Sequence, residues 1–193
     1  MRFISAALAA VLLIGGCGAI GNREGPENAS ASPPPSEGTV VISTGAAAPC
    51  VMASTFLIIA PLGQTYIENK LPFNGVNTIT VDAWSSKSDF TDHQGNISVL
   101  NLPAGDYEVY TWLAGNFVPI RIPYAKFTVE AGKAVYVGEF YLPVACRANT
   151  LGGFRDQEDR DLSFVRQKNP AFASVVFDKR IARFAGYIVN NKQ

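Results

Sequence analysis

The stretch 97–142 constrains the fold of this chain more than any other part of the sequence. It contains apolar runs rich in Val, Tyr, Phe and Trp, and a turn signal ends each run, first at 103–106 (PAGD) and then at 130–133 (EAGK). Short apolar runs separated by Gly, Pro and Asp are typical of consecutive antiparallel strands. The sequence therefore predicts a meander over 97–142.

Both faces of these predicted strands are apolar. Successive side chains of a strand point to opposite faces, which places Val135 and Val137 on one face of the last strand and Tyr136, Phe140 and Leu142 on the other. A sheet with one face in water would alternate more cleanly, so another element should cover the second face. If it stays uncovered, it becomes a surface for a binding partner, formed by Tyr110, Trp112, Tyr136 and Phe140.

Further strands are predicted before the meander, at 39–43, 52–60 and 78–84. With the later ones they make about seven short strands, separated by closely spaced turns. This pattern favours a mainly β fold, an antiparallel β-sandwich.

The end of the chain changes period and predicts helices. The segment 156–169 begins with acidic residues, ends with Arg166 and Lys168, and stops before Pro170, as helices do. Apolar residues then recur at spacings of four, three and four, which indicates a second helix, although 174–177 also suits a strand. These residues are Phe177, Ile181, Phe184 and Ile188.

Charge favours packing of this helical tail against the body. Residues 18–146 carry a net charge of −5 and residues 147–193 a net charge of +4. We expect the tail from Asp156 onward to pack across the sheet at Trp112, so that helices lie on one outer face of the sandwich. Two alternatives are that the opposing sheet covers this face, and that the basic tail contacts anionic lipid or cell-wall polymer.

The amino terminus reads as a signal peptide over 1–16. Arg2 precedes an apolar run over 3–14, which as a helix would span ~18 Å, well short of the ~30 Å of a bilayer core. The residues Ile14-Gly15-Gly16-Cys17 then resemble a bacterial lipoprotein lipobox. The resemblance implies cleavage before Cys17 and acylation of this cysteine, palmitate included. Gly18 in place of Asp favours the outer membrane, facing the periplasm of a Gram-negative host.

The mature chain divides into a tether and one domain. Residues 17–38 are rich in Gly, Asn, Ser and Pro and predict a disordered tether of roughly 25 Å reach. Residues 39–193 then form a single domain, with the helical tail at 156–193. Cys50 and Cys146 remain as an even pair in an oxidising compartment, which predicts a disulfide. A redox or metal pair is the alternative, but no Cys-x-x-Cys spacing supports it.

The segments 99–109 and 127–137, with the motifs LPAGDYEV and VEAGKAVYV, resemble the ends of carboxypeptidase-regulatory-like and transthyretin-like sandwich domains, and of periplasmic lipoproteins of uncharacterised function. The resemblance covers about forty residues. It implies a fold and carries no catalytic residues.

The sequence offers few candidates for chemistry. His93 is the only histidine, and it lies in the polar segment 89–96, which suits a turn. A calcium site on Asp89 and Asp92 is the weaker reading of this segment. We find no phosphate-binding loop and no zinc motif in the sequence. We therefore expect no catalytic residue, metal, cofactor or nucleic-acid partner.

Three functions follow from these patterns. The sequence favours a non-enzymatic interaction or structural module, anchored to the envelope membrane by lipid and facing an envelope protein or cell-wall partner. Its 21 aromatic residues support a second hypothesis, a small-ligand binder with an aromatic cleft. A hydrolase that uses carboxylates or His93 is the third. A deep pocket would favour the binder, and a perturbed carboxylate pair the enzyme.

Overall fold

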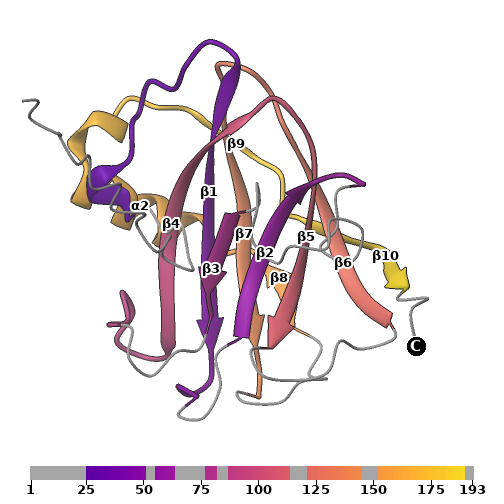
Figure 1. Cartoon of the computed structure of the whole chain (residues 1–193). Coiled ribbons are helices and arrows are strands. Elements are labelled where there is room, and N and C mark those ends of the chain that lie inside the picture. The colour runs from indigo at the N-terminus through magenta and orange to yellow at the C-terminus, as the bar shows by residue number, and fades with distance from the viewer. Residues whose placement is uncertain are drawn as a thin grey trace, which may run out of the picture.

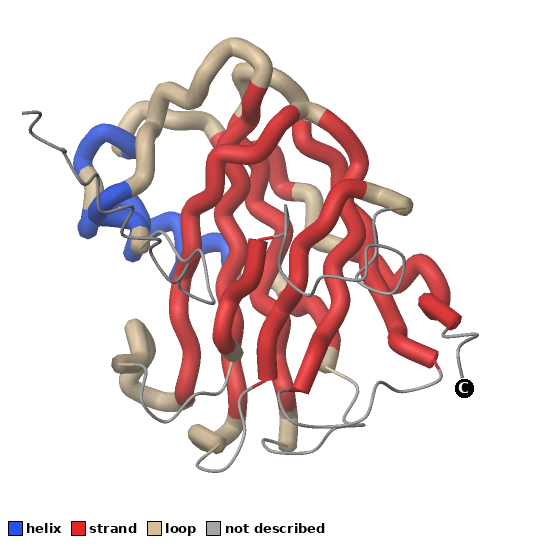
Figure 2. The backbone as a smooth tube through the Cα atoms, in the orientation of Figure 1, coloured by secondary structure: helices blue, strands red, loops and turns tan. Residues whose placement is uncertain are grey.

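The computed structural model of the chain describes residues 25–50, 55–63, 77–81, 87–113, 121–144 and 152–189, apart from the side chains of residues 112 and 113. These residues form a mainly β fold with two five-stranded sheets. Figure 2 shows the strands gathered in the body of the molecule and the helical segments at one side of it.

The first sheet has the strand order β4-β1-β7, and β8 and β9 share the far edge of β7. Strands β1 and β9 both run parallel to β7, whereas β4 and β8 pair antiparallel with their neighbours. The predicted sandwich was antiparallel throughout, so these parallel pairs correct it. The strands of this sheet are β1 Glu37–Ala46, β4 Gln94–Pro103, β7 Ala134–Leu142, β8 Gly153–Arg155 and β9 Phe177–Lys179.

The second sheet has the order β10-β6-β5-β2-β3, and all of its pairs are antiparallel. The described residues therefore contain ten strands rather than the seven expected. Figure 1 shows β10 at one edge of the body, on the side away from the helices. The strands of this sheet are β2 Thr55–Pro61, β3 Asn77–Thr80, β5 Gly105–Leu113, β6 Arg121–Val129 and β10 Arg183–Val189.

The predicted meander over 97–142 is divided between the two sheets. β4 and β7 belong to the first sheet, and β5 and β6 belong to the second. The turns at 103–106 and 130–133 thus lead from one sheet to the other. Both are held by the segment that enters β1, because Ser36 and Glu37 accept backbone hydrogen bonds from Ala104 and Gly132. Local turn chemistry gave the strand ends correctly but did not specify the sheet.

The main core lies between the sheets. Val40 and Ile42 of the first sheet and Leu57, Ile59 and Val109 of the second belong to one apolar cluster and are at most 2% exposed. Each sheet contributes one face of alternating apolar side chains to this cluster. The arrangement is sandwich-like.

A β-bulge in β7 changes which side chains face this core. Val41 is paired with Tyr136 and Ser43 with Glu139, so β7 has one extra residue at this point. Phe140 and Leu142 consequently turn into the core with Val135 and Val137, instead of sharing a face with Tyr136. Gly138 makes the bulge possible, because its φ of 99° disfavours other residues and a Cβ there would lie 3.1 Å from the Arg155 carbonyl oxygen.

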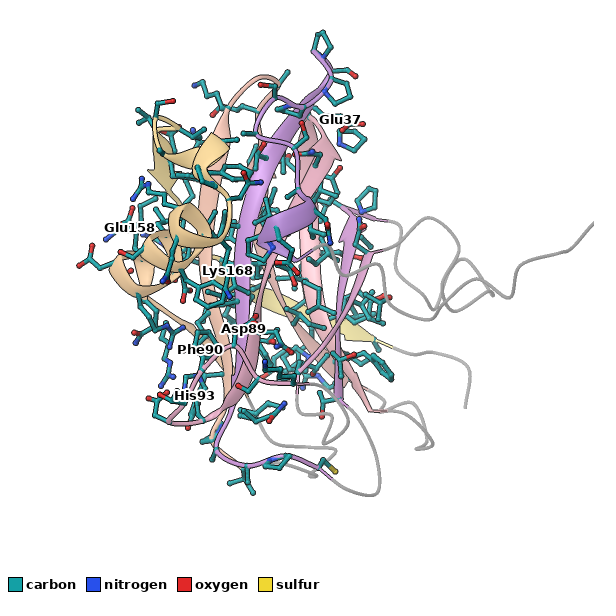
Figure 3. The ribbon with its side chains drawn as sticks, turned by 90° about the vertical axis from the view of Figure 1, so that its left-hand side faces the viewer. Glu37, Asp89, Phe90, His93, Glu158 and Lys168 are labelled. Carbon is teal, nitrogen blue, oxygen red and sulfur yellow. The ribbon has the colours of Figure 1, made fainter. Side chains whose placement is uncertain are left out.

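Helix α2, Glu158–Lys168, covers the outer face of the first sheet (Figure 3). Leu162 and Val165 of α2, with Phe172 of the short helix η2, Pro170–Phe172, belong to one buried cluster with residues of that face. β5, which carries Trp112, is in the second sheet, so the predicted contact between this helix and the sheet at Trp112 is wrong. The sheet residues of the cluster are Val41, Ile97, Val99 and Tyr136.

The second predicted helix is absent from the described residues, which form β9 and β10 over this part of the chain. Phe177 lies in β9, Ile181 in the connection, and Phe184 and Ile188 in β10. The register of β10 shifts between Phe184 and Gly186. This irregularity, together with the break between the strands, produces a spacing that resembles the period of a helix.

The segment before β1 lies on the folded body. Helix η1, Pro26–Asn28, is followed by Ala29, which is 7% exposed. The Asn169 side-chain amide donates to the carbonyl oxygens of Pro26 and Ala29, both at 3.0 Å. Residues from Gly25 onward thus have an ordered place, although we expected a tether over 17–38. The predicted signal peptide and Cys17 fall before the first described residue. None of the helices in the described ranges has the length and apolarity to cross a bilayer.

Cys50, at the end of the first described range, is 1% exposed and disulfide-bonded. Cys146, the partner that the sequence predicts, lies outside the described residues. The pairing of these two cysteines stays a prediction.

Candidate functional site

A cavity of about 380 Å³ opens between the two sheets on the β10 side of the molecule. β5 and β6 of the second sheet line it on one side, and β7 and β8 of the first sheet line it on the other. The segment 181–184 passes from the first sheet to the second and contributes a further wall, because Ala182 donates to the Val137 carbonyl while Arg183 already pairs with β6. We call this the lateral cavity.

Aromatic rings form much of the wall of the lateral cavity. Phe140 and Phe154 meet edge to face, with ring centroids 5.5 Å apart. The backbone approaches Phe140 closely at Gly152, just before β8, where a Cβ would lie 2.1 Å from the ring. Phe184 stands at the mouth and is 64% exposed. Tyr110 and Tyr124 also border the cavity, although their side chains pack in the apolar cluster on the outer face of the second sheet.

The polar character of the cavity is slight. Among the described residues that line it, Arg183 is the only charged one, and none is His, Cys, Asp or Glu. The wall therefore offers the hydroxyl group of Thr111 without a general base beside it. Small-molecule sites are mostly apolar and occupy about 300–1,000 Å³, and this cavity fits that description. A cavity of this kind binds a ligand through burial of the ligand's apolar surface.

A cluster of charged residues lies elsewhere, between the first sheet and α2. The bulge in β7 turns Glu139 to the outer side, where its side chain is fully buried. One carboxylate oxygen of Glu139 contacts His93 Nε2 at 2.9 Å and accepts from Arg160 Nη2 at 3.0 Å, and the other accepts from Arg155 Nε. Figure 3 shows Phe90 and His93 on the side of the sheet that α2 covers.

Asp161 of α2 is the second buried carboxylate of this cluster. It accepts from Ser43 Oγ at 2.5 Å and from the Tyr136 hydroxyl at 2.9 Å, and it pairs with Arg160 at 2.7 Å. Arg160 therefore joins Asp161 to Glu139. Every oxygen of the two carboxylates has a donor, as buried charges require.

The pKa values of the two carboxyl groups move in opposite directions. Burial opposes ionisation of Glu139, but the hydrogen bond from Arg155 and the charges of Arg160 and Arg155 outweigh it and hold its pKa below the usual value. Burial raises the pKa of Asp161, against the hydrogen bond from Ser43 and the Arg160 charge. Burial and the neighbouring Asp161 raise the pKa of Tyr136, so this hydroxyl is a donor at neutral pH.

Aromatic rings support the cations of the cluster. The Arg155 guanidinium lies 3.7 Å from the ring centre of Tyr141, and that of Arg160 lies 4.0 Å from Phe90. Phe90 in turn stacks on His93, with ring centroids 4.5 Å apart. The cluster thus fastens the loop before β4 and helix α2 to the sheet.

This geometry bears on the hydrolase hypothesis. His93 Nδ1 contacts Asp92 at 2.7 Å and Nε2 contacts Glu139, so both ring nitrogens face carboxylates. The two hydroxyls of the cluster, those of Ser43 and Tyr136, both donate to Asp161. Within the described ranges no hydroxyl or thiol contacts the imidazole, and no set of three or more His, Cys, Asp or Glu side chains is grouped to hold a metal ion. Asp89, proposed for calcium, instead accepts from the backbone N–H of Ile97.

The four aromatic residues expected on one surface occupy different places. Tyr110 is 2% exposed and packs with Ile58 and Ile122 on the outer face of the second sheet. Tyr136 is fully buried beneath α2, and Phe140 belongs to the core, where it lines the lateral cavity. The side chain of Trp112 lies outside the described part of the chain. Tyr110, Tyr136 and Phe140 therefore form no common surface, because two sheets and one bulge separate them.

Sequence reasoning missed the residues that build the cavity. Phe154 belonged to no recognised sequence pattern, and Phe184 was assigned to the apolar face of the second predicted helix. Gly152-Gly153 beside Phe154 was the available signal, since paired glycines often mark a close approach of backbone to a ring. Comparison with family models, curated proteins and solved structures finds no match for this chain.

Proposed function

We propose that this chain is a lipid-anchored protein of the bacterial cell envelope, whose β-sandwich is a non-enzymatic module that binds a small apolar ligand in the lateral cavity. The cavity carries this proposal: it has about 380 Å³, Phe140, Phe154 and Phe184 stand in its wall, and none of the described lining residues is His, Cys, Asp or Glu. Burial of apolar surface supplies about 25 cal/mol per Å². A ligand enclosed here needs no other source of affinity.

The location rests on the sequence. The lipobox resemblance at 14–17 and the signal-peptide pattern before it support cleavage and acylation at Cys17, and Gly18 supports the outer membrane. The resemblance of 99–109 and 127–137 to periplasmic lipoproteins agrees with this setting. A binder held at the membrane surface by lipid would take up or present apolar molecules of the envelope.

Binding can be tested with a neutral fluorescent probe. The full chain with Cys17→Ser is titrated with N-phenyl-1-naphthylamine, whose emission rises in apolar surroundings. Ala182 lines the cavity and is 4% exposed. Replacement by leucine places extra volume there, so Ala182→Leu should weaken probe binding at least tenfold.

Ala171→Leu is the matched control, because Ala171 is exposed on η2, away from the cavity. Circular dichroism shows whether each variant folds. A second variant, Phe184→Ser, guards against failure of the first, since Phe184 lines the mouth of the cavity and is 64% exposed, so its replacement should leave the fold intact. Equal probe binding by the parent and both folded cavity variants would remove the proposal.

A further inference from the structure

A strip of exposed apolar residues continues the lateral cavity along the inner face of β6 and β10. The register pairs Phe184 with Ala125, Tyr187 with Pro123 and Val189 with Arg121. Directly paired residues in an antiparallel ladder point to the same face. Ala125 belongs to the core between the sheets, so these three pairs share the inner face of the second sheet.

The bulge in β10 creates this strip. Phe184 and Tyr187 are three residues apart and would lie on opposite faces of a regular strand. The register shift between Phe184 and Gly186 brings them to one face, where their rings meet edge to face with centroids 5.3 Å apart. The exposed fractions are 64% for Phe184, 44% for Tyr187 and 51% for Val189. The strip is continuous with the cavity, because Phe184, Pro123 and Ala125 also line the cavity.

A cation marks the outer end of the strip. The guanidinium of Arg121 lies 4.3 Å from the ring centre of Tyr187 and, within the described residues, makes no ion pair. β6 and β10 contain no acidic residue. Glu108, on β5, is opposite Lys126, whose side chain lies on the other face. From Ala125 to Arg121 the strand rises by ~13 Å at ~3.3 Å per residue.

We infer that the ligand of the lateral cavity is a single-chain anionic amphiphile of the fatty-acid class, an inference that rests on the function proposed above. Its alkyl chain fills the cavity and lies along Phe184 and Tyr187, and its carboxylate pairs with Arg121. A guanidinium matches a carboxylate through two parallel hydrogen bonds. A wholly apolar ligand would leave the cation unused, and a compact polar ligand would leave the rings of Phe184 and Tyr187 uncovered.

Displacement of the bound probe by two ligands of equal chain length separates these possibilities. Laurate below its micellar concentration and dodecanol below its solubility limit compete with N-phenyl-1-naphthylamine on the full chain with Cys17→Ser. We expect laurate to displace the probe at a concentration at least tenfold lower than dodecanol, the scale of a hydrogen bond to a charged group. Arg121→Gln should abolish this difference, and Lys168→Gln, an exposed cation at the end of α2, should preserve it.

Phe184→Ser tests the strip itself. Phe184 is mostly exposed, so this variant should fold. It should weaken the binding of laurate and the binding of dodecanol by similar factors. If laurate and dodecanol compete equally in the parent chain, the anionic head group is wrong while the binding function stands. If the probe never binds, the function itself fails. A stable dimer that Phe184→Ser dissociates would show that the strip is an interface between copies, which would also overturn the inference.

Discussion

Glu139→Gln tests whether the charged cluster beneath α2 stabilises the fold. The substitution keeps the shape of the side chain but removes its charge, and it leaves one oxygen to accept hydrogen bonds. The wild-type carboxylate has three contacts, from His93, Arg155 and Arg160. In the variant, the new amide N–H₂ must face at least one of these donors.

The expected loss of unfolding free energy depends on how deeply the two partners of each Glu139 ion pair are buried. Breaking a buried ion pair costs about 3–5 kcal/mol, because the remaining charge is left without a partner. The Arg155 and Arg160 side chains are 40% and 30% exposed, so each can turn partly towards water. We therefore expect Glu139→Gln to lower the free energy of unfolding by about 3 kcal/mol, the lower end of that range.

Urea unfolding of both proteins, followed by circular dichroism at two pH values, measures this loss. The pKa of Glu139 is lower in the folded state than in the unfolded state, so its ionised form stabilises the fold above the unfolded pKa of ~4.3. This contribution is lost as the pH falls through the folded-state pKa. The difference between wild type and variant should thus be full at pH 7 and shrink in acid.

Asp156→Asn provides the control. Both side chains of the Asp156–Lys179 pair are exposed, so this substitution should leave the unfolding midpoint nearly unchanged. A loss below about 0.5 kcal/mol for Glu139→Gln, the scale of an exposed substitution, would refute the reasoning. A loss that grows in acid would contradict the assigned direction of the pKa shift.

Three further predictions follow from the anchor, the cysteines and the helix. Cys17→Ser should move the protein out of the membrane fraction or leave it unprocessed, and wild-type fractionation and processing of this variant would contradict acylation. Alkylation without reductant should leave Cys50 and Cys146 unmodified, and both should react after reduction and unfolding; free thiols in protein from an oxidising compartment would refute their pairing. Leu162→Ala should lower the free energy of unfolding in denaturant by about 2–5 kcal/mol, because Leu162 is buried against the first sheet. Val176→Ala, at an 83% exposed position, should lower it little. Equal losses in the two variants would mean that α2 contributes no packing there.

Local signals in the sequence were sufficient for the elements that depend on neighbouring residues. The apolar runs around Tyr107 and Val135 predicted strands, and the turn residues at 103–106 and 130–133 placed their ends. The acidic start and basic end of 156–169 predicted a helix there, and α2 spans Glu158–Lys168. These features follow from backbone preference and from charge near helix ends, which act over a few residues.

The assignment of strands to sheets needed the tertiary structure. A turn such as 130–133 can lead to the same sheet or to the opposite one, and here backbone hydrogen bonds from residues more than sixty positions away hold both turns. The parallel pairing of β1 with β7 joins segments about ninety residues apart. No local pattern reports such contacts, because the energy that selects them comes from burial between distant segments.

The sequence by itself determined the strands up to Leu142, the position of the described α-helix, and the pattern that predicts an acylated amino terminus. Only the tertiary structure decided the site. The bulges near Gly138 and Gly186 each add one residue, which turns Glu139 to the helix side and Phe184 and Tyr187 to the cavity side. Side-chain direction in a strand alternates with every residue, so a single insertion reverses everything after it. The position of such an inserted residue depends on pairing between distant strands, which cannot be read from the sequence.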